Sequence, residues 1–333
     1  MPPDLEHFNF RDLHPAVAIG TASDRYAGWI GQIYSADRYT GQILQRSKRV
    51  GRKQFTEEVL PVESVEEYFD HFQVLELDFT FYGPLLDREG NENPNYHVLK
   101  KYGRHLKPGD RLILKVPQMV FARKRIRGEA FVENDLFLDA EAFTRQFYEP
   151  ATTLLGEGID GLIFEQEYQR TGDRLPLNEF AGLLGTFFSR IPEDDRYHVE
   201  IRTEGFLRPA VFDALERHGV GQVLSHWTWL PALSRQFALS GGRILNRGRR
   251  LLIRLMTPRG MRYEDAYAKA HPFSRQVEGM TDPAMVRETV SLMRLAGSQG
   301  GKATVIVNNR AGGNAPLIAR EIAAQFLEQA SES

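Results

Sequence analysis

Short apolar runs alternate with amphipathic stretches along the whole chain. Eight runs have the length and composition of buried strands: Ala16–Gly20, Val74–Tyr82, Arg111–Pro117, Gly161–Glu167, His198–Arg202, Gln222–Trp227, Leu251–Met256 and Thr304–Asn309. Between most of them apolar residues recur at helical spacing, as at Val65, Phe69 and Phe72. Such alternation is typical of parallel strands joined by right-handed crossovers. Eight units in 333 residues predict an α/β fold, a closed parallel (β/α)8 TIM barrel, with an open doubly wound sheet as the alternative.

The domain organisation follows from the same pattern. No break in composition divides the chain, so we expect a single domain over residues 1–333 with its barrel core at 16–330. Two stretches, 34–56 and 83–107, fall outside the strand–helix alternation and are expected to be loop insertions at the mouth of the barrel.

Composition excludes several classes of protein. The absence of cysteine rules out disulfides and thiolate chemistry. A formal net charge of −2 gives no overall field that attracts a polyanion. The polar, acidic N-terminus is unlike a signal peptide, and no apolar run is long enough to span a bilayer. We therefore expect a cytoplasmic protein without a membrane partner, and no feature of the sequence specifies an oligomeric state.

Charged residues inside the predicted strands are the candidates for chemistry, because strands of a parallel barrel are buried on both faces and are otherwise apolar. Side chains alternate between the faces of a strand, which places His198, Glu200 and Arg202 on one face. The simplest arrangement directs a mixed set toward the barrel axis: Glu76, Lys115, Glu165 or Gln166, Glu200, Arg202, Arg254 and Asn308. Most of these residues lie near the carboxyl ends of their strands, where barrel enzymes have their active sites.

The residue types suggest a division of roles at this mouth. Glu76 and Glu200 are candidates for general acid and base, and Lys115 for an anion ligand or an amine whose pKa is lowered by burial. The predicted catalytic set is therefore Glu76, Lys115 and Glu200. The predicted substrate-binding set is Tyr82, Glu165, Gln166, Arg202, Trp227, Arg254 and Asn308. The alternative for the same cluster is structural, with ion pairs that hold the strands in register.

Several segments also resemble a known family. They are ELDFTFY at 76–82, YAGWIGQIY at 26–34, LILKVP at 112–117, VEIRTEGF at 199–206 and VNNRAGGNAP at 307–316. In type and order they are similar to the motifs of the uncharacterised barrel family called domain of unknown function 72. The resemblance implies an α/β barrel of unsettled activity. It also favours Gln166 over Glu165 as the interior residue, because the family more often has glutamine there. The chain departs from the family at Ala22-Ser23-Asp24, where the family has Ser-Gly-Trp.

These observations give a leading hypothesis and two alternatives. The leading hypothesis is an enzyme of the hydrolase or lyase type that uses acid–base chemistry on a small anionic molecule, phosphorylated or carboxylated. The basic run Arg123–Arg127 after the third strand favours a nucleic-acid-binding or phosphodiester-acting barrel as one alternative. A non-catalytic small-molecule binding protein is the other. No cofactor and no metal ligands are predicted. A divalent metal is the weaker hypothesis, because lysine and arginine are mixed with the carboxylates.

Overall fold

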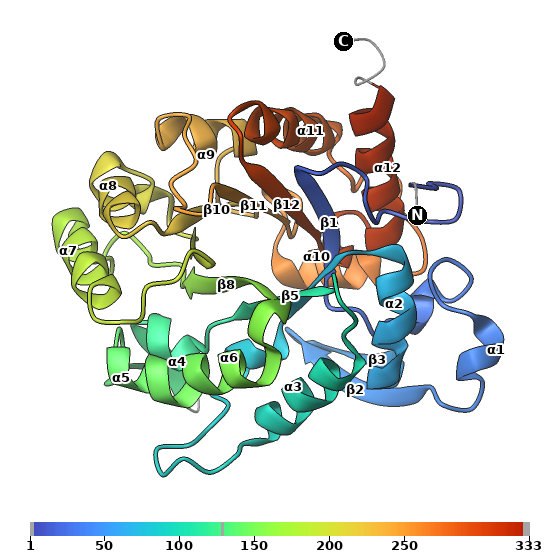
Figure 1. Cartoon of the computed structure of the whole chain (residues 1–333), viewed down its shortest axis with the longest axis horizontal. Coiled ribbons are helices and arrows are strands. Elements are labelled where there is room, and N and C mark those ends of the chain that lie inside the picture. The colour runs from blue at the N-terminus through green and yellow to red at the C-terminus, as the bar shows by residue number, and fades with distance from the viewer. Residues whose placement is uncertain (1–2, 128–129, 329–333) are drawn as a thin grey trace.

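The computed structural model describes residues 3–127 and 130–328, without the side chains of residues 125–131. Within this part, eight parallel strands close into a barrel in the order β1-β12-β11-β10-β9-β8-β5-β4 (Figure 1). They are β1 (Val17–Ala22), β4 (Val74–Leu77), β5 (Arg111–Lys115), β8 (Ile159–Gln166), β9 (Tyr197–Ile201), β10 (Gly221–His226), β11 (Arg250–Leu255) and β12 (Lys302–Val307). The predicted closed (β/α)8 barrel is confirmed, and the open sheet is wrong.

Helices surround the barrel because outward-facing strand residues and one face of each main helix are apolar. Val199 and Ile201 of β9, for example, belong to the same buried cluster as Phe187 of α7. The helices are α1 (Ala36–Tyr39), α2 (Val65–His71), α3 (Pro94–His105), α4 (Gln118–Phe121), α5 (Ala140–Phe143), α6 (Glu149–Leu155), α7 (Leu177–Phe188), α8 (Pro209–Arg217), α9 (Leu233–Leu239), α10 (Tyr263–Ala270), α11 (Pro283–Ser298) and α12 (Ala315–Glu328). A π-helical turn at Thr144–Tyr148 joins α5 to α6.

The barrel interior is built in two layers that position the candidate site. Inward-facing side chains form a separate apolar cluster: Ala18, Ala22, Val74, Ile113, Ile163, Val223, Leu252 and Ile306. On four of these strands, the next inward-facing side chain lies two residues closer to the carboxyl end and is charged: Glu76, Lys115, Glu165 and Arg254. The apolar cluster therefore closes the barrel from below, and a charged layer lies above it at the carboxyl ends.

Three segments differ from the sequence prediction. The second predicted strand ends at Leu77 instead of Tyr82, because the chain turns into a 3-10 helix at Phe79–Tyr82. The hydroxyl of Thr80 fixes this turn by donating to the carbonyl of Lys115 and accepting from its amide. The predicted loop at 83–107 contains α3, a helix with proline in its first turn and Leu99 and Tyr102 buried.

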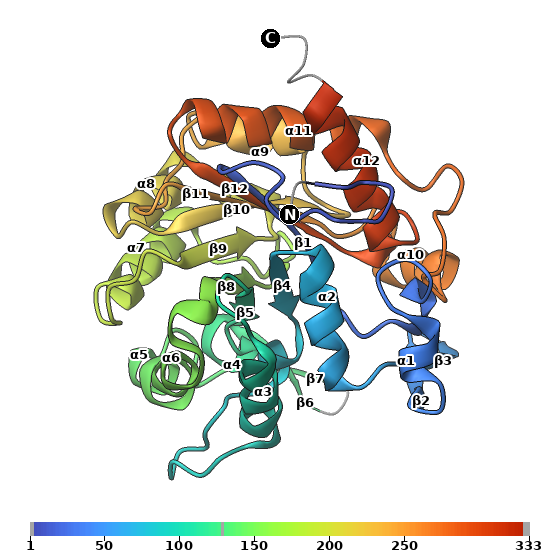
Figure 2. The ribbon, with the colours of Figure 1, turned by 45° about the vertical axis from the view of Figure 1, so that its right-hand side comes forward.

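The segment 34–56, expected as a loop insertion, forms most of an antiparallel hairpin. The hairpin consists of β2 (Leu44–Val50) and β3 (Lys53–Val59) and lies close to α1 and α10 (Figure 2). Tyr267 of α10 donates its hydroxyl to Glu57 at 2.6 Å, and the Lys48 ammonium lies 5.1 Å from the Tyr267 ring. The hairpin is thereby held beside the mouth of the barrel.

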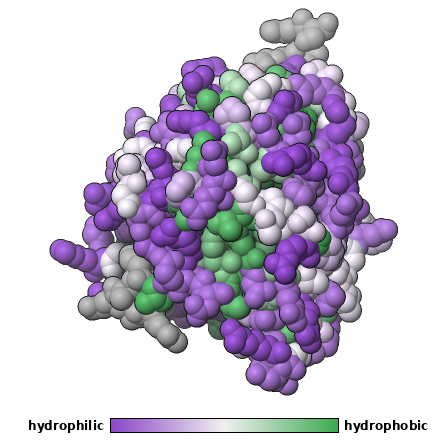
Figure 3. Space-filling model, turned by 90° about the vertical axis from the view of Figure 1, so that its left-hand side faces the viewer, coloured by the Kyte–Doolittle hydropathy of each residue, from purple (hydrophilic) through white to green (hydrophobic). Residues whose placement is uncertain are grey.

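The surface in Figure 3 is hydrophilic around its edge and has a patch of hydrophobic side chains near its centre. In residues 3–127 and 130–328, no helix combines the length and the apolar content needed to cross a bilayer.

Candidate active site

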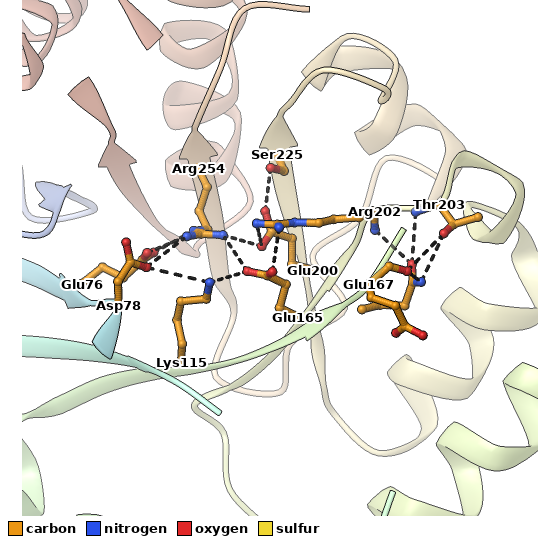
Figure 4. Close-up of polar contacts among 11 residues, drawn as sticks. Glu76, Asp78, Lys115, Glu165, Glu167, Glu200, Arg202, Thr203, Ser225 and Arg254 are labelled. Atoms are coloured by element: carbon orange, nitrogen blue, oxygen red, sulfur yellow. Dashed lines mark hydrogen bonds and ion pairs between the residues drawn. The ribbon is translucent and has the colours of Figure 1, made fainter. Parts of the chain in front are cut away.

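The centre of the charged layer is Arg254, whose side chain is entirely buried (Figure 4). Its Nε and Nη2 donate to the two carboxylate oxygens of Glu76 at 2.7 and 2.5 Å, and its Nη1 donates to Glu200. Glu200 also accepts from the Ser225 hydroxyl at 2.7 Å and from Arg202 at 3.2 Å. Every charge at this depth is therefore paired, as buried charges must be.

A second group of ion pairs lies nearer the opening. Glu165 binds the Arg202 guanidinium at 2.6 Å and also pairs with the Lys115 ammonium (Figure 4). Asp78 lies 3.8 Å from the same ammonium. Lys115 lies over the ring of Phe81 at 4.1 Å, a cation–π contact that helps to fix the amine. Two carboxylates thus share one lysine.

Burial and charge shift the acidities of these carboxyl groups in opposite directions. Burial raises the pKa of Glu76 to about 7, and Arg254 opposes the shift. For Glu200, burial is outweighed by Arg202 and Arg254, which lower the pKa to about 2. For Asp78, burial is outweighed by Lys115 and Arg254, and the pKa lies below its usual range. The layer therefore combines two carboxylates whose pKa is lowered with one, Glu76, whose pKa is raised.

A cavity of about 480 Å³ opens above this layer. Five residues of the predicted site line it: Tyr82, Lys115, Glu165, Arg202 and Trp227. The Arg202 guanidinium lies 5.2 Å from the Trp227 ring. Because Tyr82 and Trp227 follow strands that are not neighbours in the barrel, the cavity extends across the mouth.

The other predicted residues lie outside the lining of this cavity. Glu76, Glu200 and Arg254 form the fully buried network below it, so they support the residues above and do not face the opening. Gln166 accepts hydrogen bonds from the amides of Arg202 and Thr203 and fixes the turn after β9. The lining residue of β8 is therefore Glu165, and the preference for Gln166 is wrong. Asn308 is buried, and its side chain accepts from the amide of Arg310.

Comparisons with known proteins identify the family. A family model described as "Protein of unknown function DUF72" matches residues 18–333. The chain belongs to this family. Solved structures of DUF72 family proteins have the same fold: one from Enterococcus faecalis is 13% identical with a TM-score of 0.56, covering 93% of this chain and 95% of that one. Another, from Thermotoga maritima, is 15% identical with a TM-score of 0.54, covering 95% and 99%. No curated protein matches the sequence.

In this DUF72 protein, the sequence reasoning missed several polar residues that line the cavity, among them Asp24, Asp78 and Arg310. Asp24 follows β1, and one carboxylate oxygen accepts from the Tyr102 hydroxyl at 2.9 Å. Its other oxygen is buried and has no hydrogen-bond partner among the described residues. Burial raises the pKa of Asp24 to about 6. The signal was the departure from the family at 22–24, which places an acid at a strand end.

Another missed residue, Arg310, follows β12. Its guanidinium lies 4.5 Å from the ring of Tyr263, and both residues line the cavity. The structure shows no ion pair for Arg310 among the described residues, and its buried Nε has no hydrogen-bond partner there. This guanidinium therefore remains available to an anion in the cavity.

Two further expectations concern metals and nucleic acid. Within the described residues, no group of three or more histidine, aspartate or glutamate side chains is arranged to hold a metal ion. In the basic run, Arg123 lies 3.4 Å from Asp173, and Lys124 pairs with the same carboxylate. The side chains of residues 125–127 lie outside the described part.

Proposed function

We propose that this DUF72 protein is an enzyme that uses acid–base chemistry on a small phosphorylated or carboxylated molecule bound in the mouth cavity. The observation that carries the proposal is the charged layer at the carboxyl ends of the strands. Its lower half pairs every charge, and its upper half presents Asp78, Lys115 and Glu165 to an open cavity. A lower layer of this kind fixes the upper groups in place, as preorganised catalysis requires.

Asp24 and Asp78 are the pair that we assign to proton transfer. In the pairing of β1 with β4, Ala22 lies opposite Glu76, and the amide of Ser23 donates to the carbonyl of Glu76. Asp24 and Asp78 each follow two residues later, so they leave neighbouring strands at the same level. Burial raises the pKa of Asp24, while Lys115 and Arg254 outweigh burial at Asp78 and lower its pKa. Two carboxyl groups whose acidities are separated in this way supply an acid and a base at one pH.

Arg310 supplies the main attraction for an anion, because Arg202 is already paired with Glu165 and Glu200. The Arg202 and Arg310 guanidinium groups lie on aromatic rings that hold their planes, and Arg310 shows no ion pair among the described residues, although its charge helps to lower the pKa of Asp78. A planar guanidinium binds carboxylate or phosphate through two parallel hydrogen bonds. Such binding would hold the substrate above Lys115, whose ammonium could stabilise negative charge that develops during the reaction.

A thermal-shift screen tests the proposal. The probes are inorganic phosphate, sugar phosphates, hydroxy acids and sugar acids, because a ligand of the native state raises its stability by mass action. We expect at least one phosphate or carboxylate to raise the melting temperature of the wild type and to have a much smaller effect on Arg310→Gln. If every anion acts equally on both proteins, the cavity is not an anion site.

Turnover is then measured with each anion that binds. We expect Asp78→Asn to lower kcat by at least about 100-fold, the lower range for loss of a general base, while the ligand still binds. Binding by the wild type without turnover would instead make the chain a small-molecule binding protein.

A further inference from the structure

A second cavity adjoins the first and extends the mouth into a groove. It has a volume of about 710 Å³ and shares Phe81, Tyr82 and Glu165 with the first cavity. Its other side is formed by the segment after β8, including Tyr168 and Arg170. Glu165 therefore lies at the junction of two lobes. We call the cavity with Arg310 the first lobe and the cavity with Tyr168 the second.

Exposed aromatic rings are concentrated along this groove. In the described part, the exposed large hydrophobic residues are Leu44, Tyr82, Val132, Tyr168, Trp229 and Tyr263. The four aromatic ones all lie in segments that follow barrel strands. Tyr82 at the junction is 73% exposed, and the ring of Tyr168 lies 6.4 Å from those of Trp227 and Trp229. Exposed rings with a polar edge offer flat apolar faces to a ligand that has hydroxyl groups around its own rim.

The charges of the two lobes restrict the class of ligand. In the second lobe, Arg123 and Lys124 are already paired with Asp173, so they are not free for a phosphate. A nucleic acid strand is held mainly by lysine and arginine side chains that follow its phosphates. Four other guanidinium groups of the described lining show no ion pair, three in the first lobe and the last in the second: Arg25, Arg46, Arg310 and Arg170. This distribution suits a ligand with a few separated anionic groups, most of them in the first lobe.

We propose that the groove binds a chain of sugar rings with a carboxylate on the ring in the first lobe. The rings would stack on Tyr263 and Tyr82 in the first lobe and on Tyr168 in the second, and the carboxylate would bind Arg310. The linkage between the two lobes would then lie beside Glu165. This inference rests on the proposed function, of which it specifies the substrate class.

Intrinsic tryptophan fluorescence can detect such binding without any activity assay. The chain has three tryptophans, of which Trp29 is fully buried, while Trp227 lines the first lobe and Trp229 lies beside Tyr168. The probes are galacturonic acid and its dimer and tetramer, hyaluronan and alginate tetramers, a neutral cellotetraose and a single-stranded tetranucleotide. We expect an acidic tetramer to bind at least about tenfold more tightly than galacturonic acid, cellotetraose or the tetranucleotide.

Two variants locate the binding. Tyr168→Ala removes a ring of the second lobe and should weaken an acidic tetramer about tenfold, while it changes the affinity for galacturonic acid less than twofold. Tyr263→Ala, the matched change in the first lobe, should weaken both. Tighter binding of the tetranucleotide, equal affinity for tetramer and monomer, or no effect of Tyr168→Ala on the tetramer would overturn the inference.

The proposed function can fail separately from this inference. If galacturonic acid binds in an Arg310-dependent way but length has no effect, the anion site stands and the groove does not. If no sugar acid binds while a phosphate stabilises the protein in the thermal-shift screen, only the sugar-chain inference falls. If no anion of either class binds, both fall.

Discussion

Removal of Arg254 tests whether the buried charge network holds the mouth together. We consider Arg254→Met, which keeps most of the side-chain volume and removes the charge. The substitution removes two hydrogen bonds to Glu76 and one to Glu200, and it leaves both carboxylates without their central partner. Both carboxylates are fully buried, so water cannot replace the guanidinium unless the barrel opens.

The expected cost follows from these contacts. Hydrogen bonds to charged groups contribute about 1.5–3 kcal/mol each, so three of them set an upper bound of about 9 kcal/mol. Protonation of the abandoned carboxylates relieves part of this cost, and breaking a buried ion pair costs about 3–5 kcal/mol in practice. We expect a loss in that range at pH 7. The loss should grow between pH 5 and 8. In the native variant the buried Glu200 carboxyl keeps its proton without Arg254, so the variant loses stability as pH rises, whereas Glu200 of the wild type, with its lowered pKa, is already ionised over this range.

Urea unfolding measures this loss, provided that tryptophan fluorescence and circular dichroism give coincident transitions. Arg243→Met is the matched control, because Arg243 also contacts two carboxylates, Asp213 and Glu216, but is 48% exposed. Exposed pairs of this kind contribute at most about 1 kcal/mol. If Arg254→Met costs no more than Arg243→Met, the reasoning about the buried layer is refuted.

Two further predictions follow from single positions. The pKa of Asp24 is about 6 in the folded state against an ordinary 3.8, so the wild type loses stability as pH rises from about 4 to 6. In urea unfolding, the free energy of unfolding of Asp24→Asn should therefore rise by about 3 kcal/mol relative to the wild type between pH 4 and 7, and a difference that does not change with pH would contradict the raised pKa. Gly20→Ala would place its Cβ 1.9 Å from the Val74 carbonyl oxygen and should lower the free energy of unfolding by about 3 kcal/mol or more, whereas Gly182→Ala on α7 meets no atom within 4 Å and should raise it by about 1 kcal/mol. Similar melting temperatures for the two variants would argue against this packing of β1 on β4.

The sequence predicted the barrel well because its strands are buried on both faces. A run such as LLIRL in β11 is apolar except at one position, and it is distinct from any helix around it. The hairpin β2–β3 escaped prediction because most of its side chains are exposed and only Val50 is buried, so no alternation marks it. Helix α3 was missed for a related reason: Leu99 and Tyr102 are its buried residues, in an otherwise polar segment.

The sequence predicted which residues form the charged layer but not how deep each one lies in the barrel. Alternation along a strand gives the direction of a side chain but not its height, so the sequence did not separate Glu76 from Asp78, two residues further along the chain. The first is enclosed by Arg254, and the second faces the cavity. Residues after the strand ends were harder still, because the positions of Asp24 and Arg310 depend on how the loops fold back over the mouth.

The separation of acidities between Asp24 and Asp78 is the claim on which the proposed chemistry depends. Carbon-13 NMR of the protein labelled at aspartate carboxyl groups, titrated from pH 2 to 8, measures it directly. We expect one resonance with a pKa near 6 that is absent from Asp24→Asn, and one with a pKa below the ordinary 3.8 that is absent from Asp78→Asn. If both resonances titrate together near the ordinary value, the mouth holds no acid–base pair and the account is contradicted.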